Sequence, residues 1–258
     1  MRRYAQLVLS GTLACLAASP SLAQCRAASG AGTGALVELF TSEGCSSCPP
    51  AERWLAGLPA TEIAAGRLVP IALHVAYWDY LGWKDPYALP AALERQTEYK
   101  RLAAARYVYT PQVVLAGRDF RSWSSAGLTE SARRINAEPS RATLALTLQD
   151  RPDGMVQVDA TATVPAPADR PNAALYVALV QSGLVSQVKA GENRGAKLEH
   201  AHVAREWLGP FAIDPQGRAT VAKTLKRPTG APSLGLVAIV QNATSGTVLQ
   251  SLALPDCR

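Results

Sequence analysis

The sequence has few residues of the kinds that hold metals or cross-link a chain. Its 258 residues include three histidines and five cysteines, and it contains a single Cys-x-x-Cys pair, Cys45 and Cys48. A zinc site built on that pair needs two more ligands, which no second pair supplies. Despite a net charge of +6, no block of basic residues stands out, so nucleic-acid binding has little support.

The chain also lacks an apolar run long enough to remain in a bilayer. The run from about residue 7 to residue 18 is too short for a permanent span, and it follows Arg2 and Arg3. A small-x-Ala site ending at Ala23 comes after it, which predicts a cleaved signal peptide over residues 1–23. We therefore expect a periplasmic or secreted protein with a net charge nearer +4 and no stable membrane span.

The predicted cleavage also simplifies the cysteines. Cys15 leaves with the signal peptide, and an even number of four remains, which in an exported protein indicates disulfides. Cys45 and Cys48 are close enough in sequence to form a small ring. Pairing of Cys25 with Cys257 would then join the two ends of the mature chain.

The chemistry that the sequence offers is concentrated at Cys45 and Cys48. An apolar run over residues 35–40 reads as a strand before them, and a helical pattern follows them. The start of a helix favours a thiolate, so we expect Cys45 to be the nucleophile and Cys48 the resolving thiol. Half of a metal site and an inert structural disulfide are the alternatives.

Two patterns divide the mature chain. Up to residue 138, strands and helices alternate in the order β-α-β-α-β-β-α, with an aromatic and helical insertion at 76–107. From residue 142, apolar residues alternate with polar ones in several successive strands. This pattern predicts an α/β domain over 24–138 followed by a small all-β sandwich over 142–258.

Several motifs carry a family resemblance. Cys45-Ser46-Ser47-Cys48 at a strand-to-helix turn, with Thr110-Pro111 opening a later strand, resembles the thioredoxin fold, in which the proline is cis and faces the dithiol. The stretches 37–45, 74–85 and 191–195 resemble a family of bacterial secreted proteins, that of the domain of unknown function 1223. This resemblance implies a thioredoxin-like α/β domain in which Thr110 and Pro111 line the substrate groove. Gly44 departs from the usual tryptophan before the first cysteine.

Other residues are candidates for modulating the dithiol. His74 ends a predicted strand at the same sheet edge, and Glu38, if buried, is a candidate acid/base for the resolving thiol. Tyr77 and Trp78 begin an aromatic cluster that either lines a groove or packs the insertion onto its sheet. The polar segment 191–202 is either a solvated turn and strand, a weak metal site or a segment docked onto the first domain.

The sequence therefore predicts an exported thioredoxin-like thiol–disulfide oxidoreductase that acts through Cys45 and Cys48. Its partners would be a disulfide or dithiol substrate, either a protein or a small molecule, and a redox protein that resets the pair. No organic cofactor, resident metal or nucleic acid is implied. The alternatives are a copper-handling protein that uses Cys45, Cys48 and His74, and a non-enzymatic binding module with a structural disulfide.

Overall fold

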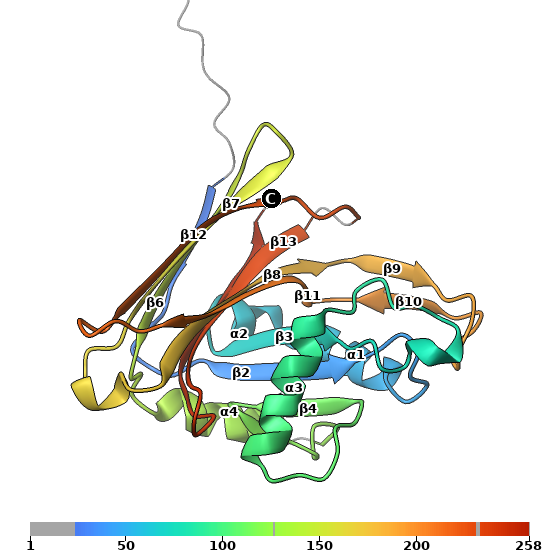
Figure 1. The fold of residues 1–258 in the computed structure, drawn as a ribbon, viewed down its shortest axis with the longest axis horizontal. Helices are drawn as coiled ribbons and strands as arrows, with labels where there is room; N and C mark the ends of the chain where they lie inside the picture. The colour runs from blue at the N-terminus through green and yellow to red at the C-terminus, as the bar shows by residue number, and fades with distance from the viewer. Residues whose placement is uncertain (1–23, 126, 231–232, 258) are drawn as a thin grey trace, which may run out of the picture.

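The computed structural model describes residues 24–125, 127–230 and 233–257, so the predicted signal peptide lies outside the described residues. Strands dominate this part of the chain, and most belong to one eight-stranded sheet in the order β14-β13-β8-β11-β3-β2-β4-β5 (Figure 1). In chain order these strands are β2 (Ala35–Thr41), β3 (Leu68–His74), β4 (Gln112–Leu115), β5 (Arg118–Asp119), β8 (Ala173–Ser182), β11 (Val203–Ala212), β13 (Ser233–Asn242) and β14 (Val248–Cys257).

A second sheet has four strands in the order β1-β6-β7-β12, and a two-stranded hairpin forms a third sheet. The four strands are β1 (Gln24–Ala28), β6 (Thr143–Asp150), β7 (Met155–Thr163) and β12 (Arg218–Lys226), and the hairpin is β9 (Leu184–Gln187) with β10 (Lys197–His200). The four-stranded sheet packs its apolar face on β8, β13 and β14. The β-sandwich expected in the C-terminal half is therefore present.

The expected fold class, an α/β thioredoxin-like domain followed by a separate small sandwich, is wrong. The described residues form a mostly β structure in which only four α-helices accompany fourteen strands. Strand β3 pairs in parallel with β11 of the C-terminal half, where Val203 lies opposite Ala72. The sheet therefore continues without a break from the N-terminal half into β11, β8, β13 and β14.

Alternation along the central strands explains how one sheet serves two hydrophobic cores. In β13, Leu236 and Ala238 belong to the core shared with the four-stranded sheet, whereas Val237 and Ile239 belong to the core beneath the helices. Successive side chains of a strand point to opposite faces, so a strand covered on both faces is a continuous apolar run. Such a run does not reveal which sheet the strand joins.

The helices cover the N-terminal half of the large sheet (Figure 1). They are α1 (Pro49–Ala56), α2 (Ala60–Ala64), α3 (Pro90–Leu102) and α4 (Gly127–Ala137), with short 3₁₀ turns η1 (Asp79–Leu81) and η2 (Pro167–Asp169). Proline occupies the first turn of α1 and of α3, where its missing N–H costs no hydrogen bond. Helix α3 packs on β2 through an edge-to-face contact between Tyr99 and Phe40.

The cysteines form the two bonds that their number and spacing predict. Cys25 and Cys257 are joined with a Cα–Cα distance of 5.6 Å, and Cys45 and Cys48 with one of 5.5 Å. The first bond links β1, in the four-stranded sheet, to the end of β14, in the eight-stranded sheet. We call it the terminal clasp.

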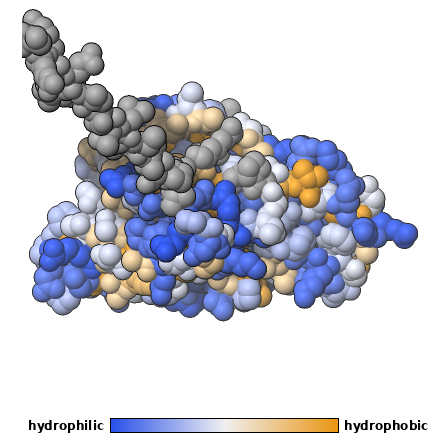
Figure 2. All heavy atoms as spheres, turned by 90° about the horizontal axis from the view of Figure 1, so that it is seen from above, coloured by the Kyte–Doolittle hydropathy of each residue, from blue (hydrophilic) through white to orange (hydrophobic). Residues whose placement is uncertain are grey.

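The outer surface is mostly polar, because the apolar residues are buried in the two hydrophobic cores. On the face shown in Figure 2, hydrophilic residues predominate and strongly hydrophobic ones are scattered. Among the described residues, no helix has the length and apolar character needed to cross a membrane.

Candidate redox site

The Cys45–Cys48 disulfide lies in the turn between β2 and α1. The Cys45 amide donates to the carbonyl of Ser42 (3.1 Å) and the Cys48 amide to that of Cys45 (3.2 Å), so the turn closes immediately before the helix. Cys48 is the N-cap residue of α1. The relative exposures of Cys45 and Cys48 are 1% and 0%, although Ser46 and Ser47 between them are exposed. The disulfide therefore lies directly under the surface, not on it.

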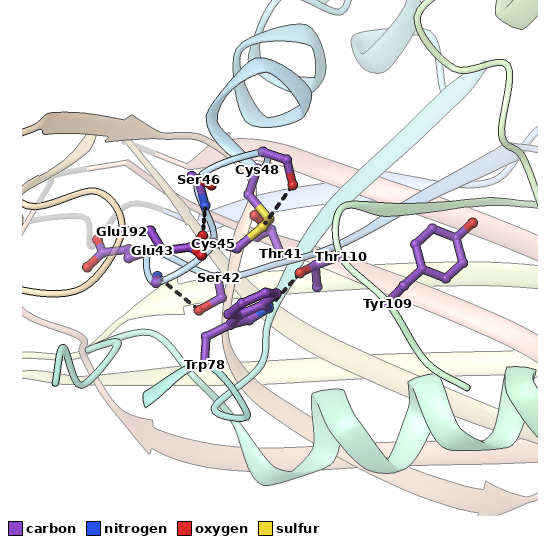
Figure 3. The surroundings of a disulfide bond; sticks show 12 residues. Thr41, Ser42, Glu43, Cys45, Ser46, Cys48, Trp78, Tyr109, Thr110 and Glu192 are labelled. Atoms are coloured by element: carbon purple, nitrogen blue, oxygen red, sulfur yellow. Dashed lines mark hydrogen bonds between the residues drawn. A yellow bond between two sulfur atoms is a disulfide. The ribbon is translucent and has the colours of Figure 1, made fainter. Parts of the chain in front are cut away.

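Trp78 and Thr110 lie on one side of the disulfide (Figure 3). The Thr110-Pro111 peptide bond is cis, as the resemblance implied. The indole Nε1 of Trp78 donates to Thr110 Oγ1 (2.7 Å), which joins the aromatic insertion to the proline segment. A Cβ at Gly44 would lie 2.8 Å from the Trp78 Cβ, so only glycine allows this close approach. The departure from tryptophan before the first cysteine thus makes room for another tryptophan.

A loop from the C-terminal half covers the other side. We call residues 188–196, which join β9 to β10, the strap. Asn193 Nδ2 donates to the carbonyls of Glu43 (2.8 Å) and Cys45 (2.9 Å), and Glu192 accepts a hydrogen bond from the Ser46 amide (2.9 Å). The strap is therefore docked against the disulfide turn and is not a solvated turn.

A chain of buried ionisable groups, the histidine cluster, lies beside the disulfide turn. It consists of Glu43, Glu52, His74, Asp85 and His200. His200 lies between two carboxylates, with Nδ1 2.5 Å from Glu52 Oε2 and Nε2 2.9 Å from Glu43 Oε1. His74 Nδ1 is 2.8 Å from Asp85 Oδ2. The two imidazole rings meet edge to face with centroids 5.2 Å apart.

The pKa values of this cluster follow from ion pairing that outweighs burial. Burial lowers the pKa of His200, but its hydrogen bonds to Glu43 and Glu52 raise it to about 9. Burial likewise lowers the pKa of His74, and the charge of Asp85 reverses the direction. The pKa of Glu52 and that of Asp85 are lowered because their histidine partners outweigh burial.

Neighbouring side chains hold the cluster in place. Thr41 Oγ1 donates to Glu52 Oε1 (2.6 Å), and the Trp83 indole donates to Glu43 Oε2 (2.7 Å). The Glu43 amide donates to Asp85 Oδ2 (2.9 Å). The aromatic insertion therefore both covers the disulfide and supports the cluster.

Glu38 lies elsewhere. It accepts hydrogen bonds from Arg95 and Tyr99 of α3, and its side chain is fully buried. Thr41, three positions along β2, bonds to α1, and residues an odd number apart on a strand point to opposite faces. Glu38 is thus held against α3, on the face opposite the cluster.

Sequence reasoning missed most of the residues around the dithiol. Glu43 and Glu52 flank the motif, and Glu52 follows Cys48 by four residues, a spacing that places both on one face of a helix. That spacing was a usable signal for Glu52. Asp85, Glu192 and Asn193 lie in the stretches 74–85 and 191–195 that carry the family resemblance, but nothing in the sequence places them beside the dithiol.

Comparison with known proteins identifies the family of this chain and two structures of similar fold. Over residues 36–241 the chain matches the model of the family described as "Protein of unknown function (DUF1223)", and it belongs to that family. No curated protein sequence matches it.

Two solved structures are similar to this one. The crystal structure of protein AGR_C_4864 from Agrobacterium tumefaciens is 25% identical, with a TM-score of 0.59 over 88% of this chain and 96% of that one. HBP35 of Porphyromonas gingivalis is 14% identical, with a TM-score of 0.64 over 87% of this chain and 75% of that one, and it shares the fold alone.

Proposed function

We propose that this protein is an exported thiol–disulfide oxidoreductase that works through Cys45 and Cys48. The observation that carries the proposal is the position of this disulfide. It joins two cysteines three positions apart at the first turn of α1, directly beneath the exposed Ser46 and Ser47. A short ring at a helix start favours the thiolate that exchange requires. An export signal and a second, distant disulfide agree with an oxidising compartment.

The exchange transfers two electrons and balances within the two pairs. In the reduced protein, the Cys45 thiolate attacks a substrate disulfide, forms a mixed disulfide and releases one substrate thiolate, which takes up a proton. Cys48 loses its proton and attacks Cys45 Sγ, which restores the Cys45–Cys48 bond and releases the second substrate thiol. A dithiol redox partner then reduces the pair, or the same steps run backward and oxidise the substrate.

Exchange at this site requires that the buried sulfur atoms become accessible to the substrate. Because neither cysteine is more than 1% exposed, a substrate reaches Cys45 only when part of its surroundings moves away, and the strap and Trp78, which flank the disulfide turn, are the candidates. Asn193 is the strongest candidate for holding the strap closed, since it makes two hydrogen bonds to the backbone around Cys45. Loss of these two hydrogen bonds removes about 1–3 kcal/mol of stabilisation from the closed strap, which corresponds to a change of about 5- to 150-fold in the opening equilibrium.

The experiment compares reduction of insulin by wild type, Cys45→Ser and Asn193→Ala in the presence of a dithiol reductant. Arg194→Gln is the control for the strap, because the Arg194 side chain is exposed and does not hold the turn. We expect turnover in wild type, none in Cys45→Ser, and a reaction of Cys45 that is faster by about 5- to 150-fold in Asn193→Ala. A wild type that reduces insulin no faster than the reductant alone would remove the proposal.

A further inference from the structure

One buried atom in the histidine cluster has no partner. The His74 side chain is fully buried, and its Nδ1 is bonded to Asp85. Its Nε2 contacts no hydrogen-bonding group within the part of the chain that the structure describes. A buried ring nitrogen without a partner costs free energy, and its usual explanation is a bound ion or water.

The atoms around this nitrogen are suited to a cation. One ligand atom each from Glu52, His74 and His200 can be chosen so that all three lie within 4.8 Å of one another. Ligands 2.0–2.2 Å from a tetrahedral zinc ion lie about 3.4 Å apart, so shifts of about 1 Å bring the three onto one ion. They come from α1, the end of β3 and the end of β10, three elements that the fold already brings together.

The outer contacts of both histidines match those of metal-bound imidazoles. A ligating histidine usually directs its other ring nitrogen to a carboxylate, which fixes the ring and its tautomer. Asp85 Oδ2 faces Nδ1 of His74 at 2.8 Å, and Glu43 Oε1 faces Nε2 of His200 at 2.9 Å. The nitrogens left over are Nε2 of His74 and Nδ1 of His200, and the second already faces Glu52 Oε2.

We infer that Glu52, His74 and His200 form a site for a divalent transition-metal ion, of which zinc is the best match. The ligands would be His74 Nε2, His200 Nδ1 and a Glu52 carboxylate oxygen, a two-imidazole, one-carboxylate set. The ion takes the place of the proton between His200 and Glu52. Asp85 and Glu43 act as positioning residues, and three protein ligands leave a fourth position for water or another ligand.

This site is separate from the copper alternative raised by the sequence, which joined His74 to Cys45 and Cys48. The two sulfurs are bonded to each other, whereas the three proposed ligands carry nitrogen and oxygen donors and need no reduction of the disulfide. The inference is also independent of the proposed function, because metal binding and insulin reduction are measured separately.

The test begins with wild type whose disulfides are oxidised. The protein is refolded from denaturant with Zn²⁺, so that burial of the site does not prevent loading, then desalted and analysed for metal. We expect about one equivalent of zinc, X-ray absorption with two imidazoles and no sulfur in the first shell, and tetrahedral d–d bands when Co²⁺ replaces zinc. Refolded wild type without bound zinc, or with sulfur ligands, would overturn the inference.

Variants assign the ligands. His74→Gln and His200→Gln should each weaken zinc binding by more than tenfold, and Asp85→Asn by about 10- to 100-fold through loss of positioning. The control is His202→Asn, which removes the third histidine of the chain at a position outside the cluster and should leave affinity unchanged. Loss of binding in His202→Asn, or full binding in both His74→Gln and His200→Gln, contradicts the assignment.

Discussion

Arg95→Met tests whether the buried ion pair that joins α3 to β2 stabilises the fold. The guanidinium of Arg95 pairs with Glu38, and the two side chains are 7% and 0% exposed. Arg95 Nη2 also donates to the Tyr99 hydroxyl (2.8 Å), and the guanidinium carbon lies 4.8 Å from the centre of the Trp207 ring. Arg95 therefore links helix α3 to both N-terminal and C-terminal strands of the large sheet.

The expected decrease in the free energy of unfolding follows from the Glu38 charge that Arg95→Met leaves unpaired. Without Arg95, the Glu38 carboxylate stays buried with no counter-charge, and breaking one partner of a buried pair costs about 3–5 kcal/mol. Urea unfolding at pH 7 measures the change in the free energy of unfolding through the transition midpoint. Removal of both charges in a Glu38→Leu, Arg95→Met double variant should recover most of the loss, because no uncompensated charge remains.

The same helix supplies a matched control. Arg101 pairs with Glu98 on the solvent side of α3, where the side chains are 60% and 44% exposed. Arg101→Met should cost no more than about 1 kcal/mol. If Arg95→Met costs as little as Arg101→Met, the Glu38 pair is solvated and the reasoning from burial is refuted.

Two further predictions concern stability. Replacing Cys25 and Cys257 by serine removes a cross-link between residues 232 positions apart, so thermal unfolding should show a lower Tm. In the chain-entropy model the free energy of unfolding falls by up to about 5 kcal/mol. An unchanged Tm would show that the clasp does not stabilise the fold. Burial lowers the pKa of His202 to about 4, so below pH 6.5 the unfolded chain binds a proton at this residue that the folded chain does not bind. The contribution of His202 to the free energy of unfolding should therefore fall by roughly 3 kcal/mol as pH drops from 6.5 to 4. His202→Asn, which suits the φ of 58° there, should flatten that fall in urea titrations, and parallel profiles would contradict the assignment.

Local elements could be predicted from the sequence because their signals are local. The strand before Cys45, the helix after Cys48 and the alternating strands β6 and β7 follow from residue periodicity. The clasp follows from cysteine count and export. These inferences need no knowledge of which strands are neighbours.

Sheet membership could not be predicted, because it depends on pairing between distant segments. Strand β11 breaks its apolar pattern with bulges after Ala204 and Leu208, so its sequence does not read as a strand, yet it joins β3 to β8. Missing that strand made the two halves look separate. Likewise, Asn193 lies 148 residues from Cys45. The sequence left open whether its segment is a solvated turn or a docked one, and it did not indicate the disulfide as the place where the segment docks.

The reduction of the two disulfides in one folded sample tests the central claim most directly. The protein is equilibrated in thiol buffers of graded potential, quenched with acid and alkylated, and each cysteine is mapped by mass spectrometry. We expect Cys45–Cys48 to reduce in the native fold at a less negative potential than the clasp, which closes a far longer loop and should stay oxidised to below about −300 mV. Reduction of both bonds together, or of the clasp first, would show that Cys45–Cys48 is a structural bond.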